Sequence, residues 1–363
     1  MTNLLELPAM TRLILALGVA MLVSFSSTPL VKKMAYKVGA IDVPKDGRRM
    51  HDHPIPRLGG LAIALAFLLT VFLFAEIDHQ MQGILLGAIL ILVLGILDDC
   101  LTLRAMPKLV IQILAATIVV AHGCTIRYLT NPFSPIPWDL GIFAGPVTVI
   151  WIVTMTNAVN FIDGLDGLAV GVSGISCASM LVIALVVSEQ NVAVIMAALL
   201  GACVGFIPYN FNPAKIFMGD TGSTFLGFVL AAMSIQGLFK LYAVVSFVIP
   251  FIILGVPFFV ICFAIVRRLW RHQNPMTADR GHIHHRLIDM GFSQKQSVAI
   301  TYTLTGILGL AAVLLASSGG AKIIILICTV MVVSVLAFMV IFGPRHRPGK
   351  KGSNQSRGKD EVK

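Results

Sequence analysis

The sequence contains few charged residues. Only 12% of its 363 residues are Asp, Glu, Lys or Arg, and 57% are hydrophobic, against about 25% and about 45–50% in ordinary soluble domains. This shortage of charge excludes a water-soluble globular protein. Six cysteines are present, but none form a CxxC pair and most lie in apolar segments. We therefore predict neither a disulfide framework nor a zinc site.

Apolar runs of roughly membrane-spanning length, about 20 residues each, recur from Leu13 to Phe342. Backbone groups cannot stay unpaired in hydrocarbon, and the runs are too continuous for barrel strands, so we predict helices. The predicted fold class is all-α, in a polytopic integral membrane protein with about eleven transmembrane helices. Their approximate ranges are 11–31, 58–75, 81–97, 108–122, 143–160, 167–187, 191–208, 223–238, 241–266, 298–317 and 321–343.

The first run lacks a clear cleavage signal, so we expect a retained span rather than a signal peptide. Residues 1–343 are predicted to form a single transmembrane domain. Residues 344–363 are basic and polar, and we expect a disordered tail. In the ninth span, Pro250 and Pro257 predict a break or kink.

Basic residues exceed acidic ones by 27 to 17. They stand between and after the apolar runs, where such residues orient a protein in a bilayer, so nucleic acid is not an expected partner. Counted on alternate sides of the eleven spans, 23 of the 27 fall on one side. By the positive-inside tendency this side is cytoplasmic, which places the N-terminus outside and the C-terminus inside.

Hydrogen-bonding residues gather in loops on the predicted cytoplasmic side. Asp98 and Asp99 follow an apolar run, and acids near a helix C-terminus are disfavoured unless a cation or basic partner neutralises them. Mg²⁺ is a suitable cation, because it takes oxygen ligands and shares them with substrate phosphates. A solvated helix end is the alternative.

Residues 157–167 interrupt another apolar run with two amides, two acids and two glycines. Asn157, Asn160 and Asp163 recur every three residues, as does Asp166, so on a helix they would line one face. The glycines allow the close backbone approach that a ligand loop needs. Polar contacts between packed helices are the alternative.

Two further features suit anionic ligands. Asp220 opens the next apolar run at a helix N-terminus, where free N–H groups also favour phosphate; a simple helix cap is the alternative. Basic and imidazole side chains gather in two other loops of the same side. They are Arg48, Arg49, His51, His282, His284, His285 and Arg286. The alternative is a solvated basic loop for residues 280–286, and positive-inside orientation for the charge of the first loop.

Taken in order, five blocks resemble the polyprenyl-phosphate N-acetylhexosamine-1-phosphate transferases, a membrane family that includes the phospho-muramoyl-pentapeptide transferase. The HIHH block resembles the N-acetylglucosamine branch, which includes enzymes that start teichoic-acid or O-antigen synthesis. The pentapeptide branch usually has three consecutive histidines. The blocks are 41–44 with 48–60, 94–99, 157–168, 209–210 with 217–223, and 278–287.

This resemblance implies transfer of N-acetylglucosamine 1-phosphate from its UDP-sugar to undecaprenyl or another polyprenyl phosphate, releasing UMP. The reaction is expected at the cytoplasmic face of the bacterial inner membrane. The resemblance also implies Mg²⁺, or Mn²⁺, held by Asp220 and Asn160 with Asp98. Asp98 would orient or deprotonate the lipid phosphate, with Asp99 supporting the site.

The remaining roles also follow from the resemblance. Asp163, Asp166 and Phe217 would hold the uridine, and Asn157 and Asn210 are further substrate-binding candidates. His282, expected to be catalytic, would grip the diphosphate or sugar together with His284, His285 and Arg286. Arg48, Arg49 and His51 would face incoming phosphate.

The sequence leaves several alternatives open. The same chemistry could use another UDP-N-acetylhexosamine or UDP-muramoyl-pentapeptide. A transporter or a non-catalytic lipid-binding protein is the alternative from another class, although transporters place their ionisable groups nearer the bilayer midplane. Val260 stands where relatives commonly carry Asp, which leaves the contribution of that position open. Sugar epimer, lipid length, downstream polymer and a homodimer are also undecided.

Overall fold

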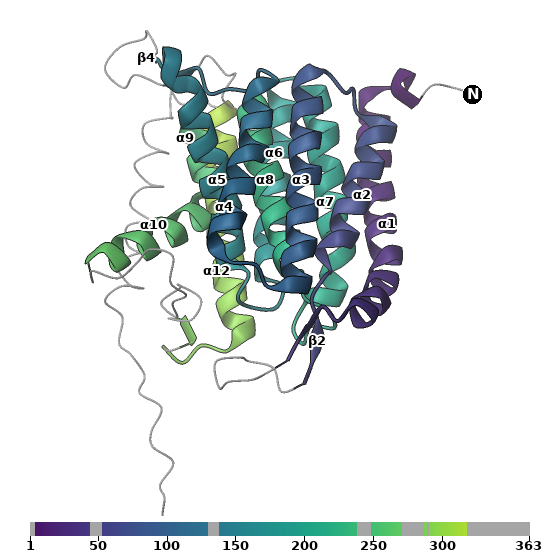
Figure 1. The fold of residues 1–363 in the computed structure, drawn as a ribbon. Helices are drawn as coiled ribbons and strands as arrows, with labels where there is room; N and C mark the ends of the chain where they lie inside the picture. Colours follow the sequence, from purple (N-terminus) through teal and green to yellow (C-terminus); the bar gives the residue numbers. More distant parts are fainter. Residues whose placement is uncertain are drawn as a thin grey trace, which may run out of the picture.

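The computed structural model describes residues 4–43, 53–129, 138–237, 248–270 and 287–317 except 289. Long helices run up and down between the two ends of a bundle, and two short hairpins add strands (Figure 1). The helices are η1 (Leu4–Glu6), α1 (Ala9–Val38), α2 (Gly60–Phe74), α3 (His79–Leu101), α4 (Ala105–Ala121), η2 (Gly141–Phe143), α5 (Ala144–Ile162), α6 (Leu168–Val186), α7 (Gln190–Asn210), α8 (Gly219–Gly237), α9 (Val248–Ile253), α10 (Gly255–Trp270) and α12 (Gln294–Ser317). The antiparallel hairpins pair β1 (Ile41–Asp42) with β2 (Ile55–Pro56) and β3 (Tyr128–Leu129) with β4 (Trp138–Asp139).

The predicted all-α architecture is confirmed within the described residues. The first eight predicted spans correspond in order to α1–α8, the described part of the ninth holds α9 and α10, and the tenth lies in α12. Six helical segments are long and apolar enough to cross a membrane: α1, α3, α5 together with η2, α6, α7 and α12. The eleventh predicted span and the basic tail lie outside the described residues.

Helix α8 lies at the centre of the bundle. Every residue from Thr221 to Gly237 is buried, and α8 contacts α2, α3, α5, α6 and α7. A helix that is apolar all round belongs in such a core. Small residues permit the close approach, because a methyl group on Gly60 of α2 would collide with the Gly222 backbone. The N-terminus of α8, with Asp220, is consequently surrounded by neighbouring helix ends.

The ninth predicted span is broken, as its prolines predicted. Helix α9 ends at Ile253 and α10 begins at Gly255, and Figure 1 shows α10 turned away from the direction of the bundle helices. Trp151 of α5 packs against α9 next to the break: the ring centroids of Trp151 and Phe251 are 4.6 Å apart. Val260 of α10 is buried, so an apolar side chain fits this position in the described packing.

Candidate active site

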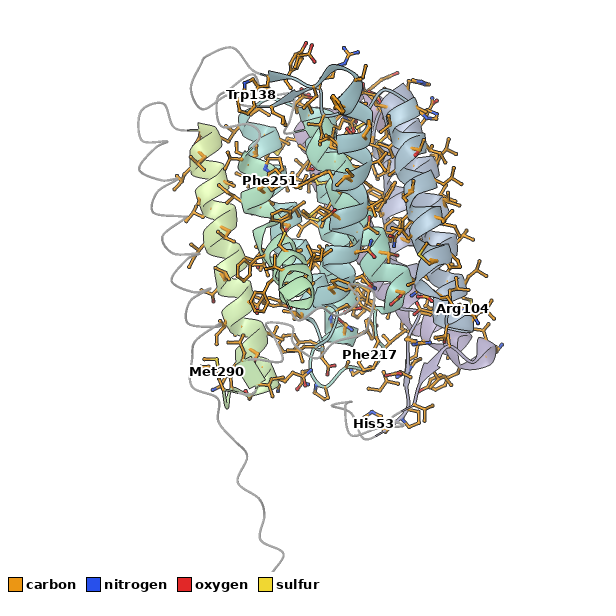
Figure 2. All side chains as sticks on the ribbon, turned by 60° about the vertical axis from the view of Figure 1, so that its left-hand side comes forward. His53, Arg104, Trp138, Phe217, Phe251 and Met290 are labelled. Atoms are coloured by element: carbon orange, nitrogen blue, oxygen red, sulfur yellow. The ribbon has the colours of Figure 1, made fainter. Side chains whose placement is uncertain are left out.

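Loops far apart in the sequence meet at one end of the bundle. The Phe217 N–H donates to the Pro56 carbonyl at 2.8 Å, and the Gly59 N–H donates to the Phe217 carbonyl at 2.9 Å. Figure 2 shows His53, Arg104, Phe217 and Met290 toward this end, with Trp138 at the opposite end. Four polar segments were predicted to lie on the same side of the membrane. Three of them, around Asp98, Asp163 and Asp220, lie together at this end of the bundle.

Asp99 caps the central helix. One carboxylate oxygen accepts the Asp220 N–H at 3.1 Å, and the other accepts the Thr221 N–H at 3.0 Å and its hydroxyl at 2.6 Å. A carboxylate is stabilised there by the helix dipole and the free N–H groups. Gly219 has φ +74°, and a side chain on it would collide with the Asp99 carboxylate. Asp99 therefore positions the first turn of α8.

The Asp220 side chain contacts Lys108 and Asn160 and does not cap α8. Because Asp99 satisfies the first N–H groups of α8, Asp220 is not the cap, and that alternative reading of the sequence is wrong. Its carboxylate instead accepts hydrogen bonds from the Lys108 ammonium at 2.9 Å and from the Asn160 amide at 3.1 Å. The Asn160 amide also donates to the Ser223 hydroxyl at 2.8 Å.

Lys108 joins the two predicted acidic segments. Its ammonium forms ion pairs with Asp98 and with Asp220. The other Asp98 oxygen accepts the Leu103 N–H at 2.7 Å, which fixes the turn after α3. Asp98, Asp220 and Asn160, the three side chains predicted to hold a metal, thus belong to one cluster around Lys108. We call these four residues the acidic cluster.

Arg57 supports the same end from the first loop. Its guanidinium donates to the Asp99 carbonyl at 3.2 Å, and its Nε lies 4.0 Å from an Asp99 carboxylate oxygen. The residue lies three positions before Gly60, the first residue of α2. The Arg57 contact therefore ties the α1–α2 connection to the C-terminus of α3, beside the acidic cluster.

The loop between α5 and α6 contains the two predicted uridine-binding acids, and they differ in their contacts. Asp166 accepts the Asn212 amide at 2.9 Å and the Ala214 N–H at 3.1 Å, so it orders the α7–α8 connection. In the part of the chain that the structure describes, the Asp163 carboxylate accepts no hydrogen bond. Loss of water around it, together with the carboxylates of Asp220, Asp99 and Asp166, raises the pKa of Asp163 well above its usual value.

Two predicted substrate-binding amides are engaged with the protein. Asn210 is 3% exposed; its side chain accepts the Gly167 N–H at 3.1 Å and donates to the Ile216 carbonyl at 3.0 Å. Asn157 exchanges hydrogen bonds with Gln112 of α4, the shorter at 2.6 Å. Their direct contact with substrate stays a prediction; in the structure they connect helices and loops.

Of the remaining predicted site residues, the structure describes Phe217. Phe217 is partly exposed and lies three residues before Asp220 in the chain. Seven lie outside the described residues: Arg48, Arg49, His51, His282, His284, His285 and Arg286.

Sequence reasoning missed two residues of this end, Lys108 and Gln112. Lys108 carried a usable signal, because it is a basic residue in the first turn of an apolar helix, ten residues after Asp98. Gln112 is an ordinary polar residue of a membrane helix, and its sequence context does not distinguish it.

The fold and the cluster define a multi-pass helical membrane protein with an acidic site at one end. Comparison with known proteins extends this. The sequence pattern described as glycosyl transferase family 4 matches residues 81–238. The chain belongs to this family, the polyprenyl-phosphate N-acetylhexosamine-1-phosphate transferases that its sequence blocks resemble, and it is a phosphotransferase enzyme.

Three relatives illustrate the range of the family. A Bacillus subtilis protein named "Probable undecaprenyl-phosphate N-acetylglucosaminyl 1-phosphate transferase" is 43% identical over 312 residues, 85% of this chain and 86% of that protein. A decaprenyl-phosphate N-acetylglucosaminephosphotransferase of Mycobacterium tuberculosis (strain H37Rv) is 32% identical, covering 81% of this chain and 80% of that protein. A phospho-N-acetylmuramoyl-pentapeptide-transferase of Desulforudis audaxviator is 33% identical, covering 83% and 98%.

Proposed function

We propose that the protein transfers N-acetylglucosamine 1-phosphate from UDP-N-acetylglucosamine to undecaprenyl phosphate, or another polyprenyl phosphate, and releases UMP. The observation that carries the proposal is the acidic cluster, in which Lys108 bridges Asp98 and Asp220 at the N-terminus of the central helix. Two relatives with N-acetylglucosamine phosphate transfer in their names support the choice of sugar.

The reaction joins two anionic substrates. An oxygen of the polyprenyl phosphate attacks the phosphorus that carries the sugar, and the bond from that phosphorus to the UMP oxygen breaks. The attacking phosphate is largely ionised at neutral pH, since its second pKa is about 6. The protein must therefore align the groups and neutralise their charge. Lys108 supplies a cation, and Asp98 orients the lipid phosphate or accepts its remaining proton.

The acidic cluster also has suitable chemistry for Mg²⁺. Two carboxylates already converge on one cation, the Lys108 ammonium, and Asn160 places an amide beside Asp220. Within the described residues no group of three or more His, Cys, Asp or Glu side chains is arranged to hold a metal. Mg²⁺ usually uses one or two carboxylates and completes its shell with water and substrate phosphates, so the two carboxylates and the amide of the cluster would be sufficient protein ligands. Asp220, Asn160 and Asp98 would hold the ion, which would offset phosphate charge.

The neighbouring loops would bind the nucleotide. We assign the uridine to Asp163 and Phe217, because the Asp163 carboxyl group has no hydrogen-bond partner among the described residues and can serve the base or ribose. Asp166 contributes by ordering the loop between α7 and α8. The assignment of sugar or diphosphate contacts to the loop of His282 rests on the sequence resemblance.

An assay with a panel of UDP-sugars tests the function. Purified protein, polyprenyl phosphate and Mg²⁺ should give a lipid-linked N-acetylglucosamine phosphate and UMP with UDP-N-acetylglucosamine. Excess chelator should abolish turnover, and added Mg²⁺ or Mn²⁺ should restore it, because the acidic cluster needs a hard cation to receive phosphate. A preference for another UDP-sugar would correct the substrate. Full turnover in chelator would refute the metal, and a lack of lipid product with every sugar would refute the reaction.

The position of the cluster in the membrane gives a further prediction. We propose that its end of the bundle faces the cytoplasm of a bacterial cell, because 23 of the 27 basic residues are predicted on that side. In a background without native cysteines, cysteines at Gly164 and Lys215 should resist a membrane-impermeant thiol reagent in intact cells. They should react in inverted vesicles, and a cysteine at Ser188, at the other end, should behave oppositely.

These positions suit the measurement, because Gly164, Lys215 and Ser188 are all exposed. Thr221 is fully buried, and a cysteine there would be protected from either side. Labelling of Gly164→Cys or Lys215→Cys in intact cells would reverse the proposed orientation and separate the site from a cytosolic UDP-sugar.

A further inference from the structure

Tyr302 of helix α12 contacts the loop between α5 and α6, which contains Asp163 and Asp166. The Tyr302 hydroxyl donates to the Gly167 carbonyl at 2.5 Å. Gly167 directly follows Asp166 and opens α6 with φ +79°. The tyrosine ring fills a notch on α6, because a methyl group on Gly171 would collide with ring carbons of Tyr302. The side chain therefore fits closely against the first turn of α6.

The hydrogen bond is not needed to form the helix. The Gly167 carbonyl already accepts the Gly171 N–H at 3.0 Å, which is the ordinary bond of a first helical turn. The tyrosine hydroxyl adds a second donor to the same carbonyl, from a helix more than 130 residues away in the sequence. This second hydrogen bond restrains the position of Gly167 relative to α12.

The backbone N–H of Gly167 is also hydrogen-bonded. It donates to the buried Asn210 side chain at 3.1 Å. A second link from α12 runs through Gln294, whose side chain accepts the Asn212 amide at 2.9 Å, while the same amide donates to Asp166 at 2.9 Å. Helix α12 thus reaches the end of the loop directly and through the α7–α8 connection.

We propose that Tyr302 is a positioning residue for uridine nucleotide binding. By fixing Gly167, it holds the loop that contains Asp163 and Asp166 in the position that nucleotide binding requires. The inference rests on the proposed function, because it assigns uridine to that loop. Tyr302 itself need not touch the substrate. Loss of its hydroxyl should weaken nucleotide binding and leave the acidic cluster unchanged, since the Tyr302 hydroxyl bonds to Gly167 while the cluster is held by the hydrogen bonds and ion pairs of Lys108 and Asn160.

Tyr302→Phe is the sharpest test, because it keeps the ring in the Gly171 notch and removes only the hydroxyl. The KM for UDP-N-acetylglucosamine and the inhibition constant of UMP should rise about threefold to tenfold, the scale of one hydrogen bond. The kcat and the KM for polyprenyl phosphate should change less than about twofold. Tyr128→Phe makes the same chemical change at the opposite end and serves as the control.

Hydrogen–deuterium exchange gives a readout that does not require turnover. Backbone amides of residues 163–171 should exchange faster in Tyr302→Phe than in wild type, with similar thermal unfolding temperatures. Unchanged exchange, or faster exchange with unchanged UMP affinity, would overturn the positioning role. An equal loss in both KM values and in kcat would indicate a general structural role instead. If wild-type protein neither turns over UDP-N-acetylglucosamine nor binds UMP, the proposed function fails, and the assignment of Tyr302 to uridine binding fails with it, whatever the exchange shows.

Discussion

Asp220→Asn is expected to lower kcat by about a hundredfold or more, the scale of a lost electrostatic contact to the transition state. The substitution keeps the size of the side chain and lets it still accept from Asn160. It removes the charge that pairs with Lys108 and that a divalent cation would require. The fold should survive, because the first N–H groups of α8 are capped by Asp99 and not by Asp220.

The measurement compares initial rates at saturating substrates with the unfolding temperature of the same detergent preparation. Asp139→Asn provides a matched control, since it makes the same change on the exposed β4 strand at the other end of the bundle. Near-normal turnover of folded Asp220→Asn would reduce Asp220 to a structural partner of Lys108. The acidic cluster would then lose its place in the reaction.

The helices could be predicted because each depends on a local property, the length of an apolar run. The break between α9 and α10 was equally local, since a proline lacks the N–H that continues a helix and its ring crowds the preceding turn. The helix ends were less predictable. Helix α1, for example, extends to Val38, past the predicted end at residue 31, because polar side chains beyond the apolar run can continue a helix into water.

The site was predicted as a set of acids and amides, and their contacts were beyond sequence reasoning. Asp98 and Asp99 are adjacent in the chain, yet one pairs with Lys108 and the other caps α8. Successive residues on a helix point about 100° apart, so the neighbours face different partners. Which acid faces α8 depends on the packing of α3 against α8, and a single sequence does not encode that orientation locally.

Lys108→Met should have an effect comparable to that of the Asp220 substitution, for a different reason. The long apolar side chain of methionine suits a position inside helix α4, but Asp98 and Asp220 lose their shared cation. Two partly buried carboxylates then repel each other without compensation, which destabilises the metal-free protein. We expect kcat/KM to fall by about a hundredfold or more, because the cation that faces the phosphates is gone.

Metal binding separates the roles of Lys108 as a structural cation and as a participant in transfer. Without the ammonium, Asp98 and Asp220 offer more negative charge to a divalent ion, so Mn²⁺ measured by spin resonance should bind Lys108→Met more tightly than wild type. Mg²⁺ should also restore most of the lost unfolding temperature, yet turnover should stay low, since the ion replaces the charge between the carboxylates but not the donor groups of the ammonium. Lys37→Met, an exposed lysine of α1, should change none of these quantities. Recovery of full turnover with Mg²⁺ would mean that Lys108 only balances charge in the empty site. Unchanged metal affinity would contradict binding of the ion between Asp98 and Asp220.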